Sequence, residues 1–258
     1  MTARLGVDLG ATWLRACLSQ GGRARWTERR PATAWRDAPA ALRRILKRRG
    51  LRRVDELALG GTRLGSGEAR AALTKLLKPL AAKVEVVPDF EIAHRAAFGS
   101  GPGLLLVAST GSIAFARGAG GTTRRAGGLG PLLGDEGSGF WLGKAAALDP
   151  RLRRDLRLPA PLALAHSTDP VRATAALAPK VLRARSARAR RLRDAAAAHL
   201  AGLAAEAVRG LVLPRPIPLA LHGSLFKNAA LRKAVLRRLG RVALVAPRVS
   251  AERAAAGL

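Results

Sequence analysis

Cysteine, tyrosine and the side-chain amides are nearly missing from this sequence. Tyr is absent, Cys17 is the single cysteine, and Asn and Gln occur only at Asn228 and Gln20. One cysteine cannot close a disulfide within the chain or build an all-cysteine metal or iron–sulfur site. A symmetric dimer would bring only two such ligands to a shared cluster. The sequence therefore excludes a disulfide scaffold and argues against an iron–sulfur protein.

Long uncharged apolar runs are missing as well. No stretch of about 18 apolar residues lacks a charge, so we expect no transmembrane helix and no membrane partner. Asp8 interrupts the N-terminal segment before the apolar core of a signal peptide could form, so we expect a cytoplasmic protein. Hydrophobic residues make up 48% of the 258 residues, which suffices for one large domain or two modest ones.

Acidic residues are scarce relative to basic ones, and the net charge is +29. The basic residues are almost all Arg, and Ala is abundant. Both features are typical of GC-rich coding sequences, and in that case the basic residues simply form a solvated surface. The alternative is a functional basic face for nucleotides, sugar phosphates or nucleic acid. The densest basic segment, Arg183–Arg191, has no aromatic residues to stack on bases. We therefore expect no nucleic-acid partner.

Apolar periodicity divides the chain into two α/β halves. In the first half it predicts strands at 5–9, 13–18, 24–27, 54–59 and 84–87, and helices at 38–47, 68–80 and 90–98. In the second half it predicts strands at 104–108, 113–117, 122–126, 217–221 and 242–245, and helices at 138–178, 185–211, 225–239 and 250–257. Both halves open with a strand, a turn of small residues and a second strand, which indicates an internal structural repeat.

The segment Gly127–Gly143 contains seven glycines and one acidic pair. Glycine loses more conformational freedom on folding than any other residue. This concentration of glycines therefore indicates a backbone that lies very close to a ligand or another group. Asp135, at the centre of the segment, indicates a ligand with hydroxyl groups or a metal. The alternative is an ordinary glycine-rich surface turn.

Two turns between predicted strands carry phosphate-binding chemistry. In the first, Gly10 and Ala11 leave room near backbone N–H groups, Thr12 offers a hydroxyl, and Asp8 can hold Mg²⁺ directly or through water. The second, Ser109–Ser112, offers three hydroxyls and a glycine. Either turn alone could be a plain hairpin, but two at equivalent places suggest two clamps on one polyphosphate.

Two further positions follow predicted strands and open predicted helices. Gly223 and Ser224 suit an anion at a helix N-terminus, although Ser224 could be a simple N-cap. Asp89 could likewise be an N-cap, or it could be a catalytic base.

Together these segments resemble the ASKHA superfamily of sugar kinases, Hsp70 and actin, and within it the BadF/BadG/BcrA/BcrD-type ATPase and N-acetylglucosamine kinase family. The resemblance covers essentially the whole chain. It implies a two-domain α/β fold of the ribonuclease H-like or actin-like kind with a central interdomain cleft. Residues 1–98 would form the N-terminal domain and 99–258 a larger C-terminal domain, with the last helix packing on the N-terminal one.

The resemblance also implies the function: a kinase that uses ATP and Mg²⁺ to phosphorylate an amino sugar or hexose, N-acetylglucosamine or glucosamine above all. A homodimer is compatible with this function. Asp89 would take the proton from the sugar hydroxyl, and Asp8 would organise Mg²⁺ through water. The phosphate-binding residues would be Gly10, Ala11, Thr12, Thr110, Gly111, Ser112, Gly223 and Ser224. The acceptor would contact Asp89, Gly111, Gly128, Leu129 and Asp135.

The sequence departs from this family on the acceptor side. Leu129 stands where relatives often carry Trp, and Ile113 and Ala34 stand where they carry Asn. Phosphoryl transfer from ATP is therefore better supported than the identity of the acceptor. Two alternatives remain: an ATPase that activates a partner enzyme, which in this family uses cysteines that are lacking here, and a basic polyanion binder on the same scaffold.

Overall fold

A computed structural model describes all 258 residues, and the chain divides into two compact units. The first unit consists of Met1–Ser100 together with Pro247–Leu258, and the second of Gly101–Ala246. Each unit contains one five-stranded sheet. None of the helices combines the length and the apolar character that crossing a bilayer requires.

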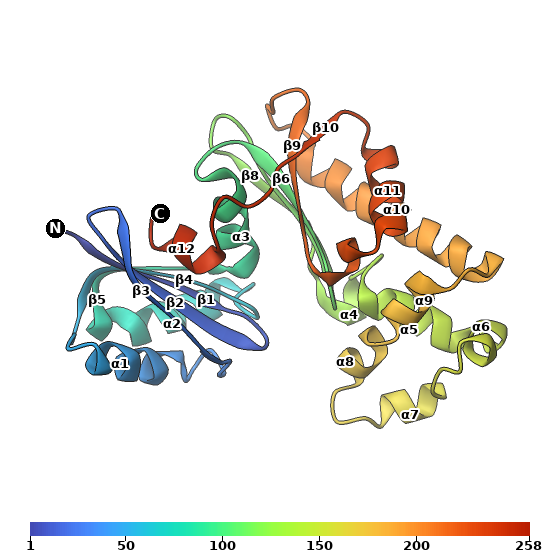
Figure 1. The fold of residues 1–258 in the computed structure, drawn as a ribbon, viewed down its shortest axis with the longest axis horizontal. Coiled ribbons are helices and arrows are strands. Elements are labelled where there is room, and N and C mark those ends of the chain that lie inside the picture. Colours follow the sequence, from blue (N-terminus) through green and yellow to red (C-terminus); the bar gives the residue numbers. More distant parts are fainter. The chain divides into compact units, whose positions relative to one another are not determined.

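The first sheet has the strand order β3-β2-β1-β4-β5 (Figure 1). The elements of this unit are β1 (Ala3–Leu9), β2 (Trp13–Gln20), β3 (Arg23–Pro31), α1 (Ala38–Arg48), β4 (Val54–Gly61), α2 (Gly67–Leu77), the 3-10 helix η1 (Lys78–Leu80), β5 (Ala81–Pro88), α3 (Asp89–Phe98) and α12 (Ala251–Ala255). β2 is antiparallel to both β1 and β3, whereas β4 is parallel to both β1 and β5. Consequently β1, β3, β4 and β5 all end at the same edge of the sheet.

The strand β1 is covered on both faces. Its residues alternate, so the odd-numbered ones from Leu5 to Leu9 join the core formed with α1 and α2. The C-terminal helix α12 covers the other face, where any side chain at Gly6 would collide with the backbone of Glu252 and Ala256. Ser19 donates a hydrogen bond from Oγ to the Ala256 carbonyl. Figure 1 shows α12 beside β1 and β4, far in sequence from either strand.

The second sheet repeats the topology of the first, with strand order β10-β9-β6-β7-β8. The elements of this unit are β6 (Gly103–Ala108), β7 (Ser112–Arg117), β8 (Thr123–Gly127), α4 (Gly130–Leu133), α5 (Gly139–Leu148), α6 (Pro150–Asp155), α7 (Pro161–Ala165), α8 (Pro170–Ala175), α9 (Ala178–Arg183), α10 (Ala187–Val208), β9 (Ile217–His222), the 3-10 helix η2 (Ser224–Lys227), α11 (Ala229–Leu239) and β10 (Val242–Leu244). Its central strand β6 pairs antiparallel with β7 and parallel with β9, just as β1 pairs with β2 and β4. The predicted internal repeat is confirmed.

Several predicted helices are wrong in extent, and most of the breaks have a local cause. The single helical stretch expected at 138–178 is four short helices, α5 to α8, three of which begin at a proline: Pro150, Pro161 and Pro170. Proline fits the first helical turn but lacks the N–H that the interior of a longer helix needs. Likewise α2 ends at Leu77, before the proline-containing 3-10 helix η1.

Candidate active site

The proposed site residues of the first unit lie at the carboxyl edge of its sheet. The turn after β1 contains Gly10, and Asp89 follows β5 as the first residue of α3. In α/β sheets, ligands bind outside the carboxyl ends of the strands, where loops from several strands meet. The strand directions thus bring together residues that are about 80 positions apart in the sequence.

Three loops are joined at this edge by backbone hydrogen bonds. The turn after β1 is closed by Gly10 N, which donates to Trp13 O at 3.0 Å. The loop after β3 is attached to this turn, because Ala32 N donates to Thr12 O at 2.9 Å. The loop after β4 joins β1 itself, because Thr62 N donates to Leu9 O at 3.0 Å. The first predicted phosphate loop is therefore held in place from two sides.

These loops surround a cavity of about 260 Å³. It is lined by Leu9, Gly10, Ala11, Ala32, Thr33, Trp35, Thr62 and Arg63. Arg63 supplies the only charge in this lining, and its guanidinium makes no hydrogen bond or ion pair. Sequence reasoning missed Thr62 and Arg63. Their position directly after the glycine pair that ends β4 was the available signal.

Asp8 lies among other carboxylates on the face of the sheet that α12 covers. Burial raises the pKa of Asp8, the charges of Asp89 and Glu252 raise it further, and Arg15 opposes the shift. Arg15 Nη1 donates to Asp8 Oδ2 at 2.9 Å, which leaves Oδ1 without a hydrogen bond. The charge of Asp89, the residue predicted to be the base, is thus one of those that act on Asp8. No three acidic, cysteine or histidine side chains converge on a common metal position.

This arrangement fits a Mg²⁺ ion that keeps several water ligands rather than one coordinated entirely by protein side chains. A buried carboxylate with acidic neighbours is stabilised by a nearby cation, and Mg²⁺ usually keeps several waters and takes one or two carboxylates. Asp8 Oδ1 is the oxygen that could accept a hydrogen bond from a metal-bound water.

Asp89 begins α3, and its side chain is half-buried. Its Oδ1 accepts a hydrogen bond from Phe90 N at 2.9 Å, which fixes the carboxylate close to the start of the helix. Pro88 precedes it as the N-cap residue without a side-chain cap. The N-cap role considered for Asp89 is therefore wrong: it is the first helical residue.

In the second unit, the segment Gly127–Gly143 is bonded directly to the loop Ser109–Ser112. Gly128 N donates to Ser112 O at 3.0 Å, Gly139 N to Ser109 O at 2.7 Å and Phe140 N to Thr110 O at 3.0 Å. Ser112 Oγ adds a bond of 2.8 Å to Glu136 O. The predicted acceptor-side segment and the predicted second phosphate loop therefore form one structure.

Asp135 is the centre of this connection. Its side chain is only 6% exposed, and its Oδ1 accepts a hydrogen bond from Ser112 N at 3.1 Å. A Cβ on Gly111 would lie 2.7 Å from the same Oδ1, so the loop approaches the carboxylate as only glycine allows. Burial raises the pKa of Asp135, Glu136 adds to the rise, and the Ser112 N–H opposes it. The carboxylate thus orders the loop Ser109–Ser112, besides any contact it makes with a ligand.

The loop after β9 reaches the same edge of the second sheet. Gly223 has φ +105°, and any side chain there would collide with the Ala108 carbonyl at the end of β6. The helix expected to begin at Ser224 is different in the structure: Ser224 starts the short η2, and Asn228 caps α11 through Leu231 N. The N-cap role considered for Ser224 is therefore wrong, and its exposed hydroxyl makes no cap bond.

Comparison with known proteins places these features in one family. The sequence model of the BadF/BadG/BcrA/BcrD ATPase family matches residues 5–256. The chain belongs to this family.

Within the family, a curated relative is the N-acetylmuramic acid/N-acetylglucosamine kinase of Clostridium acetobutylicum, which is 41% identical over 61 residues. That match spans 24% of this chain and 20% of the relative. Among solved structures, a candidate N-acetylglucosamine kinase of Chromobacterium violaceum is 25% identical with a TM-score of 0.75, covering 99% of this chain and 98% of its own. The ROK hexokinase of Thermus thermophilus shares the fold at 17% identity and a TM-score of 0.66, over 98% and 96% of the two chains. The ASKHA fold is confirmed.

The departures from the family pattern have visible consequences. The Ile113 side chain lies against Gly128, where an added Cβ would be 2.6 Å from Ile113 Cδ1. Leu129 is 58% exposed and precedes the short helix α4, which sequence reasoning missed. Ile113 and Leu129 thus present only apolar side chains at these two positions.

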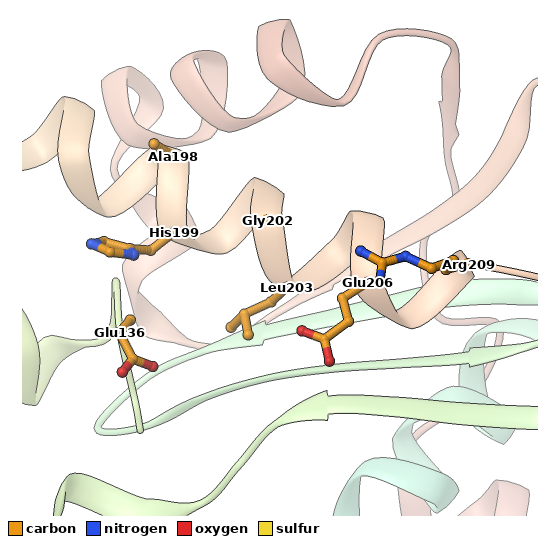
Figure 2. Close-up of a pocket in the computed structure, with 7 residues that line it drawn as sticks. All are labelled: Glu136, Ala198, His199, Gly202, Leu203, Glu206 and Arg209. Atoms are coloured by element: carbon orange, nitrogen blue, oxygen red, sulfur yellow. The ribbon is translucent and has the colours of Figure 1, made fainter. Parts of the chain in front are cut away.

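A cavity of about 450 Å³ lies along α10, beside the Gly127–Gly143 segment, which contributes Glu136 to it (Figure 2). Its lining is Glu136, Ala198, His199, Gly202, Leu203, Glu206 and Arg209. Figure 2 shows Glu136 near His199, and Glu206 and Arg209 farther along the helix. No residue predicted to bind phosphate, metal or acceptor lines it, so its size does not make it the active site.

Proposed function

We propose that this protein is an ATP-dependent sugar kinase that transfers the γ-phosphoryl group to a hydroxyl of an amino sugar or hexose. The observation that carries the proposal is the bonding of Gly127–Gly143 to Ser109–Ser112, which couples a carboxylate suited to hydroxyls with a phosphate loop. The names of the relatives support a sugar acceptor, and N-acetylglucosamine and glucosamine are the first candidates.

In the proposed reaction the protein positions the substrates and neutralises the charge of the phosphates, and it forms no covalent bond with them. In the first unit, the turn after β1 would contact phosphate through backbone N–H groups and the hydroxyl of Thr12. In the second unit, the loop Ser109–Ser112 would contact phosphate through backbone N–H groups and the hydroxyl of Thr110. Mg²⁺, organised by Asp8, would offset the charge of the phosphates. Asp89 would accept the proton of the attacking hydroxyl, which needs only a weak base because the proton leaves late.

Asp135, Gly111, Gly128 and Leu129 are the proposed acceptor contacts. Since Asp135 Oδ1 already accepts from Ser112 N, its Oδ2 is the oxygen left for a sugar hydroxyl. The exposed Leu129 and Ala34 offer no hydrogen bond to an acetamido group. We therefore propose an acceptor recognised mainly by its ring hydroxyls.

We do not propose the partner-activating ATPase. In that type of protein, cysteines hold an iron–sulfur cluster, whereas Cys17 is fully buried within β2.

The test is ADP release from ATP and Mg²⁺ in the presence of a panel of sugars. We expect at least one amino sugar or hexose to stimulate turnover, and Asp89→Asn to lower the stimulated kcat by about 10²–10⁴. Asp37→Asn is the matched control, because Asp37 lies in the same unit, is exposed and makes no side-chain cap bond. If no sugar stimulates ADP release and Asp89→Asn leaves turnover unchanged, the proposal is wrong.

A further inference from the structure

A second, smaller cavity in the first unit is lined by three arginines. It has a volume of about 230 Å³ and lies between the end of β3 and the helix α1. Its lining is Leu14, Arg30, Pro31, Ala41, Arg44, Ile45 and Arg48. No acidic residue is among them, and none of them belongs to the predicted phosphate loops.

The local structure explains why these arginines converge. On α1, positions 41, 44, 45 and 48 follow the i, i+3, i+4, i+7 spacing of one helix face. On β3, Glu28 and Arg30 are two residues apart and so point to the same face of the strand. The face of α1 and the face of β3 therefore present their basic side chains to one space.

Glu28 holds two of the three arginines in place. Its Oε1 accepts from Arg30 Nε at 2.8 Å and from Arg48 Nη2 at 2.6 Å. The Glu28 side chain is only 11% exposed, whereas the two arginine side chains are about half exposed. Although burial acts in the opposite direction, the arginine partners lower the pKa of Glu28, so the carboxylate stays ionised. Arg30 and Arg48 are thus oriented before any ligand arrives.

Arg44 is different, because it makes no hydrogen bond or ion pair within the protein. The lining contains three guanidinium groups, and the nearby carboxylate of Glu28 pairs with two of them and with Arg49 at 3.6 Å, so the cavity has excess positive charge. Leu14 and Ile45, at most 2% exposed, form an apolar floor beside it. A guanidinium binds phosphate through paired N–H donors, and a neighbouring apolar surface strengthens such contacts.

We infer that this cavity is an anion site that takes the phosphoryl dianion of a small molecule or free phosphate. The volume is below the range of about 300–1,000 Å³ that is typical of drug-sized ligands, which favours a ligand no larger than a sugar phosphate. The inference does not depend on the kinase proposal, because a ligand could bind here whether or not the protein transfers phosphate.

The experiment measures binding of inorganic phosphate, glucose 6-phosphate and glucose by isothermal titration calorimetry at constant ionic strength. The phosphate loops are first filled with a non-hydrolysable ATP analogue and Mg²⁺. The two key variants are Arg44→Gln and Arg43→Gln. Arg43 is the neighbouring residue on α1. It is also exposed and unpaired, but it does not line the cavity. Both variants remove one charge from the same helix.

We expect the wild type to bind a phosphate-bearing probe, Arg44→Gln to weaken that binding roughly tenfold, and Arg43→Gln to leave it within about twofold. Tighter binding of glucose 6-phosphate than of inorganic phosphate would identify an organic phosphate as the ligand, and equal binding would identify free phosphate. An equal loss of affinity for the phosphate-bearing probe in the two variants would show that binding follows net charge alone and would overturn the inference. Absence of binding by either phosphate probe would overturn it too.

Discussion

Single residues carry most of the chemistry proposed for this protein, and their surroundings differ sharply. Asp135 is buried and bonded to the loop it faces, whereas Thr12 and Thr110 are exposed at turns. Exposed hydroxyls at a turn are free to meet a ligand. A buried carboxylate must first be satisfied by the protein, and Ser112 N does this for Asp135.

Gly111→Ala tests the contact between the second phosphate loop and Asp135. The added Cβ would lie 2.7 Å from Asp135 Oδ1, and the carboxylate is not free to retreat because Ser112 N holds it. We expect the free energy of unfolding to fall by about 1–3 kcal/mol, measured by urea denaturation. Gly120→Ala is the control, since nothing lies within 4 Å of a Cβ there. Equal effects of the two substitutions would argue against the tight contact.

Asp8→Asn tests the electrostatics around Asp8. Because its pKa in the folded state is raised above the unfolded value of about 3.9, the folded state binds the proton more tightly. Stability contributed by this residue therefore falls as pH rises from about 4 through the folded pKa. Asn cannot ionise, so we expect Asp8→Asn to become more stable than the wild type as pH rises toward 7, in urea melts at several pH values.

The same variant should lose sugar-stimulated ATP turnover, since Asp8 is the proposed Mg²⁺ ligand. Asp37→Asn again serves as the control and should shift neither property. A constant stability difference between Asp8→Asn and wild type from pH 4 to 7 would contradict the assigned pKa shift.

At the scale of elements, the C-terminal helix α12 completes the first unit. It covers the face of β1 that carries Gly6 and Asp8, and Arg248 N just before it donates to Ala96 O of α3 at 2.8 Å. Its residue Glu252 is also one source of the raised pKa of Asp8. Residues of α12 thus influence the electrostatics beside the turn that follows β1.

Gly6→Ala should separate α12 from β1. The new methyl group would overlap the helix backbone, which cannot rotate away as a flexible side chain could. We expect a loss of about 3 kcal/mol in unfolding free energy and faster proteolysis near Pro247. Gly65→Ala in the same unit has open space at its Cβ and should change neither measurement. Wild-type resistance to protease in Gly6→Ala would show that the helix does not depend on this contact.

At the scale of the whole molecule, two features stand out: the repeated sheet topology and the net charge of +29. The repeat gives each unit an edge at which loops after parallel strands meet. The charge lies mainly on exposed arginines, and in the Arg30, Arg44 and Arg48 cavity it is concentrated against an apolar floor.

Salt separates charge-driven association from specific function. If DNA binds through phosphate contacts alone, raising salt from 50 to 200 mM should weaken its retention by about 10³-fold or more for six or more contacts. Sugar-stimulated ADP release should stay nearly constant over the same range. We expect filter-binding and turnover assays to diverge in this way. DNA retention that persists at high salt would instead favour a nucleic-acid function.

Local patterns in the sequence were enough to predict the order of strands and turns along the chain, the internal repeat and the family. Apolar periodicity, glycine-containing turns and prolines act over a few residues, so they can be recognised without a structure. The break of 138–178 at three prolines could have been predicted on the same basis.

Only the tertiary structure decided which distant residues meet. It brought Asp135 onto Ser112 and Gly111, α12 onto Gly6, and Arg44 to the cavity organised by Glu28. These contacts join segments separated by many residues, and they depend on strand direction and on the packing of helices against sheets. No local pattern encodes them, because the same side chains would serve equally well as solvated turns or surface charges.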